Sequence, residues 1–352
     1  MIKFNKGTKT IIVVGTGGVG KTTTAAAIST GLACAGFKVL VVTIDPSLRL
    51  AQAIGFKPNG IIQKIEIDSK YNLKSGELYA STVNHEIVFQ YFLTQAMGSK
   101  SNEIQIKKIT ENRLFKQLST KLSRSQDFTT LFYLYTQSIS KKYDYIVLDT
   151  PPAEHTWTFL KAPAKLSALF NSEILVWFTK TGNKPSSFFS KILKQGTEKA
   201  FDILKLLTGS EFFNELKLFF EAIQNWQTPI QNTIAECQKL LMSIETEFVL
   251  ITNFDQNKFK DSLSLSRKIY NEGYNLSHMI INLIPDWTDE KSNEHSDEIE
   301  NYRKLYKQTM KTMLDQISDS EQHLKVYKSM NLSQNINHAE MYTIYKNIEK
   351  IN

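Results

Sequence analysis

The pattern of apolar residues in the first fifty positions predicts a strand, a helix and a second strand. Thr10–Val14 is a continuous apolar and β-branched run, which is typical of a strand buried on both faces. Lys21–Ala35 is rich in alanine with apolar residues four apart, and Gly36 provides a helix stop. Val39–Thr43 repeats the strand pattern. Two such strands joined through a helix predict a parallel pair with a right-handed crossover.

The same alternation of strand and helix patterns continues along the chain. We expect further strands at Leu78–Ser81, Tyr145–Leu148, Glu247–Ile251, Met279–Leu283 and Leu324–Tyr327. Helical spacing predicts helices over about residues 85–97, 108–122 and 127–140, and a solvated helical face over residues 288–319. Repeated β–α alternation therefore predicts an α/β fold with a doubly wound, mainly parallel sheet.

One long segment, residues 184–243, has no strand pattern. Its apolar residues repeat at helical spacing, as in Phe212, Leu216, Phe219, Phe220 and Ile223. We expect a helical subdomain inserted into a core made of residues 1–183 and 244–352. Adaptable client-binding grooves are rich in methionine, and this segment holds only Met242. Core packing is therefore favoured over a client groove, while a mobile amphipathic lid remains an alternative.

Composition and charge then exclude several classes of protein. Of 352 residues, 41% are hydrophobic and 22% charged, as in ordinary globular proteins, which excludes disorder across the whole chain. The net charge of +7 comes from 42 Lys and Arg against 35 Asp and Glu, and these basic residues are scattered, so we expect no nucleic-acid partner. No apolar stretch approaches the roughly 18 residues of a spanning helix, and no cleavage site follows the first lysines. We expect a cytoplasmic protein without stable membrane insertion.

The strongest chemical signal is the glycine-rich run from Gly15 to Thr22, which fits the phosphate-binding pattern G-x-x-x-x-G-K-[ST]. Glycines let backbone N–H groups approach phosphate oxygens, and the following helix adds the positive end of its dipole. Lys21 is expected to reach the β- and γ-phosphates, and the Thr22 hydroxyl to ligate Mg²⁺. The expected nucleotide-binding residues of this loop are Gly15, Thr16, Gly17, Gly18, Val19, Gly20, Lys21, Thr22 and Thr23.

Two aspartates follow predicted strands and are expected at the same sheet edge as the loop. Asp45 ends the second strand, and Asp149 begins the string Asp-Thr-Pro-Pro. An aspartate at a strand end is by itself more often a cap or turn residue. Beside a phosphate loop, however, Asp149 has the position of a carboxylate that holds Mg²⁺. A guanine-specific N-K-x-D motif is not matched, because in Asn257–Asp261 the aspartate falls one residue late, so ATP is favoured over GTP.

Together these motifs resemble the ArsA/Get family of deviant P-loop ATPases, in particular its bacterial branch of anion-transporting ATPases. The matching segments are Gly15–Thr24, Thr43–Pro46, Asp149–Pro152, His155–Thr156, Phe159–Pro163 and Phe213–Phe220. The resemblance runs from about Ile11 to Tyr345 and implies the SIMIBI type of P-loop NTPase fold.

The resemblance also implies roles for individual residues. Asp45 would lie in switch I and position or activate the attacking water, and Asp149 would lie in switch II near Mg²⁺ and the γ-phosphate. Pro151 belongs to the same nucleotide-binding motif, and Asn282 matches an asparagine that contacts adenine. Family members are dimers in which ATP controls a helical surface for a client. The expectation is therefore a Mg²⁺-dependent ATPase that acts as a dimeric switch on an unknown protein client.

Three departures from the family pattern qualify this expectation. The signature lysine, which reaches the partner's phosphates in the family, is Thr16 here, so we expect slow hydrolysis. A paralogue that carries the lysine would supply it in a heterodimer, or Arg49 would substitute. There is one phosphate loop, so the chain is not the duplicated pump form. With only Cys34 and Cys237, neither a bridging zinc site nor an arsenite-binding triad is expected.

Three other classes of protein are alternatives to the ATPase switch. An ATP-binding, weakly hydrolysing scaffold subunit of a heterodimer is the main alternative, and Thr16 is its motivation. A partition ATPase would need an amphipathic C-terminal helix or a basic patch, and residues 338–350 are too mixed for the first. A metal-cluster reductase would need cysteine ligands that two scattered cysteines do not supply.

Overall fold

The described strands form one nine-stranded sheet in the order β3-β4-β2-β5-β1-β6-β7-β8-β9. The computed structural model describes residues 2–44, 49–71, 74–97, 126–151, 153–169, 227–288, 297–331 and 340–351. The strands are β1 (Thr10–Gly15), β2 (Lys38–Thr43), β3 (Gln63–Ile65), β4 (Glu77–Thr82), β5 (Tyr145–Asp149), β6 (Thr246–Asn253), β7 (Leu276–Ile284), β8 (Lys325–Met330) and β9 (Glu349–Lys350). The seven inner strands run parallel, whereas β3 and β9 pair antiparallel at the two edges.

This sheet confirms the predicted α/β class and each of the seven predicted strands. The two edge strands were not predicted. Gln63–Ile65 and Glu349–Lys350 are short, and the second is exposed and charged, so neither carries a hydrophobic pattern. Strand β9 is formed by pairing with an existing edge, and β3 combines such pairing with the burial of Ile65 in the core.

The helices of the described chain connect these strands. They are α1 (Lys21–Cys34), α2 (Arg49–Ile54), α3 (His85–Met97), α6 (Gln126–Ser140), α7 (Ala153–Leu160), α8 (Ala162–Leu169), α13 (Gln227–Met242), α14 (Gln256–Asn271), α15 (Asp297–Ser320) and α16 (Met341–Lys346), with a short 3₁₀ turn η2 (Asp286–Thr288). Helices α3 and α6 confirm two predictions, and the helix expected over residues 108–122 lies outside the described residues. Helix α15 is solvated except for a buried stripe of Arg303, Met310, Met313 and Ile317.

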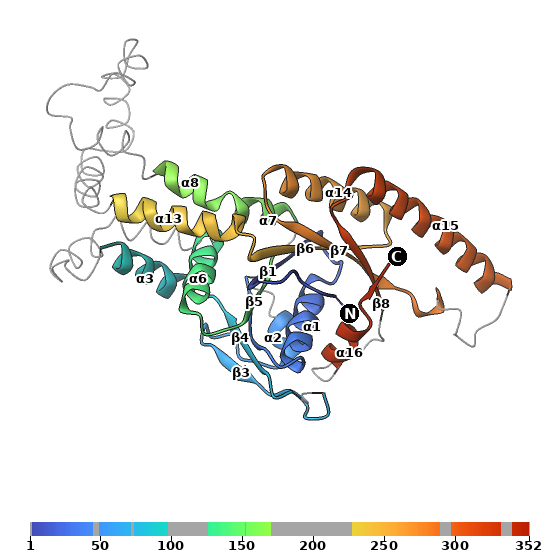
Figure 1. Cartoon of the computed structure of the whole chain (residues 1–352), viewed down its shortest axis with the longest axis horizontal. Helices are drawn as coiled ribbons and strands as arrows, with labels where there is room; N and C mark the ends of the chain where they lie inside the picture. The colour runs from blue at the N-terminus through green and yellow to red at the C-terminus, as the bar shows by residue number, and fades with distance from the viewer. Residues whose placement is uncertain are drawn as a thin grey trace, which may run out of the picture. The chain divides into compact units, whose positions relative to one another are not determined.

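Both faces of the sheet are buried, as expected of a doubly wound fold. Ile11 and Val13 of β1 belong to the core shared with α1 and α16, so the alternate residues Ile12 and Val14 face the other side, and all four are inaccessible. Figure 1 shows α1, α2 and α16 on one side of the sheet and α14 on the other. Gly31 of α1 lies directly under the ring of Tyr345, which leaves no room for a larger side chain.

The chain divides into two compact units. The sheet unit comprises Met1–Asn84, Tyr133–Phe159 and Lys239–Asn352, and the helical unit comprises His85–Phe132 and Leu160–Gln238. Within the helical unit, the rings of Phe92, Phe128 and Phe132 pack with centroids 5.0 to 6.3 Å apart. Most of the predicted insertion, including the phenylalanine repeat at 212–223, lies outside the described residues, so its bounds at 184 and 243 stay a prediction.

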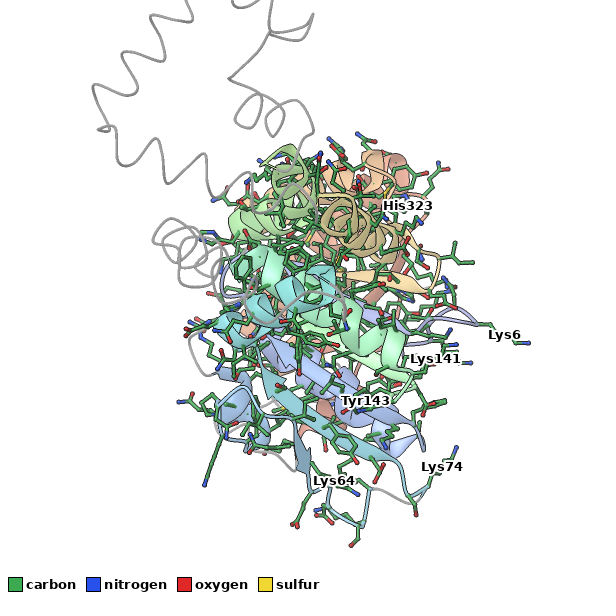
Figure 2. All side chains as sticks on the ribbon, turned by 90° about the vertical axis from the view of Figure 1, so that its left-hand side faces the viewer. Lys6, Lys64, Lys74, Lys141, Tyr143 and His323 are labelled. Carbon is green, nitrogen blue, oxygen red and sulfur yellow. The ribbon has the colours of Figure 1, made fainter. Side chains whose placement is uncertain are left out.

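The lysines labelled in Figure 2 come from separate segments of the sheet unit. Lys6, Lys74 and Lys141 point away from the protein into solvent, and Lys64 lies on the edge strand β3 (Figure 2). There the Nζ of Lys64 pairs with Glu77 at 2.5 Å. Within the described ranges, no helix combines the length and apolar character needed to cross a membrane.

A buried polar cluster fixes the N-terminal segment to the amino ends of β6 and β7. The carboxylate of Glu247 is inaccessible and accepts hydrogen bonds from the Asn5 N–H at 2.7 Å, the Ser277 hydroxyl at 2.5 Å and the Thr8 hydroxyl. The Nδ1 of His278 lies 3.2 Å from it. Burial alone would raise the pKa of Glu247, but the donors from His278, Ser277, Thr8 and Asn5 outweigh it and lower the pKa to about 2.

This depressed pKa predicts acid sensitivity that Glu247→Gln removes. A carboxyl group with a folded pKa of about 2 and a model value of 4.5 stabilises the fold above pH 4.5, and this stabilisation is lost as the pH falls toward 2. The loss amounts to about 3 kcal/mol. We expect Glu247→Gln to lower the free energy of unfolding by about 3 kcal/mol at pH 7 and to flatten its pH dependence below pH 4.5.

Urea unfolding at pH 7, 4 and 3 measures both effects. The matched control is Glu245→Gln, which removes an exposed carboxylate that pairs with Lys9 at 2.7 Å and should change stability by less than about 1 kcal/mol. Equal losses in the two variants would contradict the role of the buried cluster.

Candidate nucleotide-binding site

The glycine-rich loop lies at the carboxyl end of β1, in the middle of the sheet. Strand β1 is flanked by β5 and β6, and all three are parallel, so their carboxyl ends open on the same edge. The chain leaves β1 toward β2 on one side, while β6 begins the other half of the sheet. Ligands of doubly wound folds bind in the crevice at such a point. The fold therefore places the loop where the sequence predicted it.

Glycine is required at both ends of the loop. A Cβ on Gly15 would lie 2.3 Å from the carbonyl oxygen of Ile251 on β6, so the close approach of β1 and β6 excludes a side chain. Gly20 has φ of 88°, and a Cβ there would lie 2.3 Å from the Nδ2 of Asn282. Gly20 is also the N-cap of α1 and makes no side-chain cap. The first N–H groups of α1 thus face the loop without a side-chain acceptor, which suits an anion.

The lysine of the motif is held over this loop. Lys21 is 7% exposed, and its Nζ donates a hydrogen bond of 2.7 Å to the carbonyl oxygen of Thr16. The Thr16 hydroxyl is buried and has no hydrogen-bond partner in the described part of the chain. Thr22 and Thr23 in the first turn of α1 are half-buried. The ammonium group of Lys21, the hydroxyl of Thr16 and the N–H groups at the start of α1 together form a site in which a phosphate group would accept hydrogen bonds.

Asp149 lies at the end of β5, the strand beside β1. Its carboxylate is inaccessible, and Oδ2 accepts a hydrogen bond of 3.0 Å from the hydroxyl of Thr43, its register partner on β2. Asp149 is also the register partner of Val13, two residues before the loop. The hydroxyl of Thr22 and the carboxylate of Asp149 are the hard oxygen donors that Mg²⁺ prefers, so these residues fit the metal that the family resemblance implies.

The Asp-Thr-Pro-Pro turn is tied to the strand that leads into the loop. The hydroxyl of Thr150 donates a hydrogen bond of 2.7 Å to the carbonyl oxygen of Val13. The hydroxyl of Thr156 on α7 donates to the carbonyl oxygen of Pro151 at 3.0 Å. Pro151 is half-buried, and its predicted contact with the nucleotide stays a prediction. Helix α7 and the loop are connected through β1 by two hydrogen bonds.

Asn282 contacts the phosphate loop. It lies near the end of β7, is 5% exposed, and donates a hydrogen bond of 2.9 Å from Nδ2 to the carbonyl oxygen of Val19. Through this hydrogen bond Asn282 supports the backbone of the phosphate loop, a role that the sequence did not predict. The predicted contact of Asn282 with adenine stays a prediction.

The predicted switch I residue falls in a gap. Asp45 lies outside the described residues, and Arg49, its proposed companion, is the exposed first residue of α2. Both cysteines are buried and free, and burial raises the pKa of the Cys34 thiol to about 11 and of the Cys237 thiol to about 12. The described ranges contain no group of three or more His, Cys, Asp or Glu arranged for a metal ion.

A cavity of about 690 Å³ opens beside the loop. It is lined by Thr16 and Gly17 of the loop, by α7 through Ala153, His155 and Trp157, and by α14, which contributes Lys258, Asp261 and Lys268. No local pattern predicts that α14 reaches the loop, because Lys258 follows Gly18 by 240 positions.

The loop, its buried lysine and the neighbouring aspartate make this chain a P-loop nucleotide-binding protein with an α/β fold. The sequence pattern of the family described as anion-transporting ATPase, ArsA, matches residues 8–341, and the chain belongs to that family. The resemblance inferred from the motifs is thereby confirmed.

The individual relatives have low sequence identity to this chain. The chain is 25% identical over 229 residues to a protein assigned as arsenical pump-driving ATPase 1 of Aquifex aeolicus, covering 61% of this chain and 50% of the relative. It is 30% identical over 172 residues to ATPase GET3 of Lachancea thermotolerans, covering 46% of each. It is 28% identical over 156 residues to ATPase get3 of Aspergillus terreus, covering 44% and 43%. The chain spans half or less of the length of these relatives.

Proposed function

We propose that the protein is a Mg²⁺-dependent ATPase that works as a nucleotide-driven dimeric switch. The observation that carries the proposal is the position of Lys21, which is buried over the glycine-rich loop beside the N-terminus of α1. The names of the relatives, which are ATPases, support the reaction of ATP and water to ADP and phosphate.

The chain's own groups suit phosphoryl transfer by positioning and charge neutralisation. Lys21 exchanges the Thr16 carbonyl for the β- and γ-phosphates, and the N–H groups of α1 bind their oxygens. Asp45 orients the attacking water, and Thr22 and Asp149 hold the metal. When bound by Thr22 and Asp149, Mg²⁺ would neutralise negative charge on the phosphates.

The structure also bears on the choice of nucleotide. The string from Asn257 to Asp261 lies in the first turns of α14, and Asp255 caps that helix by accepting from the N–H groups of Asn257 and Lys258. A helical segment does not present the side chains of a guanine-binding loop. This supports ATP over GTP, with Asn282 and Pro151 beside the bound nucleotide.

The remaining parts of the proposal concern assembly. We propose a cytoplasmic homodimer, or a heterodimer with a lysine-bearing paralogue, in which ATP controls a surface of the helical subdomain at residues 184–243 for a protein client. The second candidate is an ATP-binding, weakly hydrolysing scaffold subunit. Thr16 favours it, because this residue stands where the family has its lysine.

The test is ATP hydrolysis per protomer over a wide range of protein concentration with Mg²⁺. A rate that rises with concentration and then levels is expected for a homodimeric enzyme. Background hydrolysis with tight ATP binding would support the scaffold, and absence of ATP binding would overturn both. Asp45→Asn in parallel should bind ATP normally but lose turnover by about two orders of magnitude, since general-base positioning contributes 10²–10⁴-fold.

A further inference from the structure

The phosphate loop lacks its family lysine, yet another lysine lies beside it. A Cβ built on Gly18 would lie 3.5 Å from the Nζ of Lys258, so this ammonium group is at the loop. Lys258 belongs to α14, in the C-terminal half of the sequence, and lines the same cavity as Thr16 and Gly17. The fold therefore places the ammonium group of Lys258 near Thr16, the position at which the family has its lysine.

The backbone of Lys258 is fixed, so its position is a property of the fold. Its N–H donates to the Oδ1 of Asp255 at 2.9 Å, and its carbonyl oxygen accepts from the Ser262 hydroxyl at 2.7 Å. Asp255 is the N-cap of α14, which starts three residues after β6 ends at Asn253. Because β6 is the neighbour of β1, the first turn of α14 is held next to the loop.

The charge of Lys258 is available for a ligand. Its side chain is half-buried, and within the described ranges its Nζ has neither a hydrogen-bond nor an ion-pair partner. The other titratable groups that line the cavity are Asp261 and Lys268 of α14 and His155 of α7. The two lysines outnumber the one carboxylate, so an anion is favoured there.

We propose that Lys258 binds the terminal phosphates of the nucleotide and supplies, within one chain, the charge missing at Thr16. This inference rests on the proposed function, because it assumes that ATP occupies the loop. Lysine is a flexible point charge that reaches phosphate oxygens from the rim of a site. With Lys258 in this role, the loop binds the γ-phosphate without a lysine from a partner subunit.

The test compares ATP and ADP binding with Mg²⁺ by calorimetry in the full chain. Lys258→Met removes the charge and keeps most of the stem. We expect ATP affinity to fall about tenfold and ADP affinity less, with the ATP loss shrinking in 0.5 M salt because the site is partly exposed. Lys258→Arg should retain most of the affinity. The matched control is Lys260→Met, an exposed lysine on the same helix that does not line this cavity, and it should bind as the wild type does.

A second variant separates charge from structure. Thr16→Lys in the Lys258→Met background restores the family lysine, and the cavity beside Thr16 has room for it. Recovery of ATP affinity is expected. Equal binding by the wild type and Lys258→Met, or equal losses in Lys258→Met and Lys260→Met, would each overturn the role of Lys258 and leave the proposed function standing. A wild-type chain that binds no ATP would overturn the proposed function as well.

Discussion

Lys21→Ala is expected to weaken ATP binding strongly and to abolish detectable ATP hydrolysis. Lys21 is the buried cation of the loop, and removing one partner of a close charged pair costs about 2–5 kcal/mol. With about 1.4 kcal/mol for each factor of ten, the affinity for ATP should fall by about 30-fold to several thousand-fold. Calorimetric titration with Mg²⁺ and ATP, and phosphate release under saturating ATP, measure the two losses.

The control for this prediction is Lys57→Ala, which removes an exposed lysine near α2 and should leave both measurements unchanged. The melting temperature of Lys21→Ala without nucleotide should stay within a few degrees of the wild type, because the net contribution of a hydrogen bond such as that from Lys21 to the Thr16 carbonyl is about 1 kcal/mol. Nucleotide binding by Lys21→Ala at wild-type affinity would show that the loop does not bind phosphate.

Asp149→Asn is expected to lower turnover by about a hundredfold and to remove the effect of Mg²⁺ on ATP binding. The change keeps the shape of the side chain but removes the charge that would hold the metal. ATP affinity should then be the same with Mg²⁺ and with EDTA, whereas the wild type should bind more tightly with Mg²⁺. Titrations under both conditions measure the ratio.

Stability separates this role of Asp149 from a structural one. The change keeps the size of the side chain and its hydrogen-bond acceptor for Thr43, so the nucleotide-free variant should fold and keep a cooperative unfolding transition. Thr43→Val is the matched control, because it deletes the hydroxyl that donates to Asp149 and keeps the carboxylate. It should lower turnover only a few-fold. A destabilised Asp149→Asn with normal dependence on Mg²⁺ would argue for a structural aspartate.

The sequence predicted the elements that are built by local patterns. Buried parallel strands such as Thr10–Gly15 read as continuous apolar runs, and the glycine-rich loop has a fixed spacing, so fold class and phosphate loop were predictable. Strand β9 was not, because Glu349 and Lys350 are exposed and pair only with β8. This strand forms because β8 lies beside it, and no local sequence pattern predicts such pairing.

The same distinction applies to the site. The positions of Lys21 and Asp149 follow from strand ends, and both could be placed at the sheet edge in advance. The contacts of Asn282 with Val19 and of Lys258 with the loop join segments more than 230 positions apart, and they follow from the strand order β1-β6-β7. Packing decides such contacts, and one sequence does not show them.

The hydrogen bond from Thr150 to Val13 bears on how a change of bound nucleotide would be transmitted from the phosphate loop to the rest of the protein. Val13 precedes Gly15 by two residues in an extended strand, a span of about 7 Å that does not stretch. In the proposed switch, a shift of the loop on phosphate release would therefore pull on the same backbone that anchors Thr150 and, through Pro151, the start of α7. Such a response would begin in the buried interior of the sheet, so substitutions confined to the protein surface should weaken its output without preventing its onset.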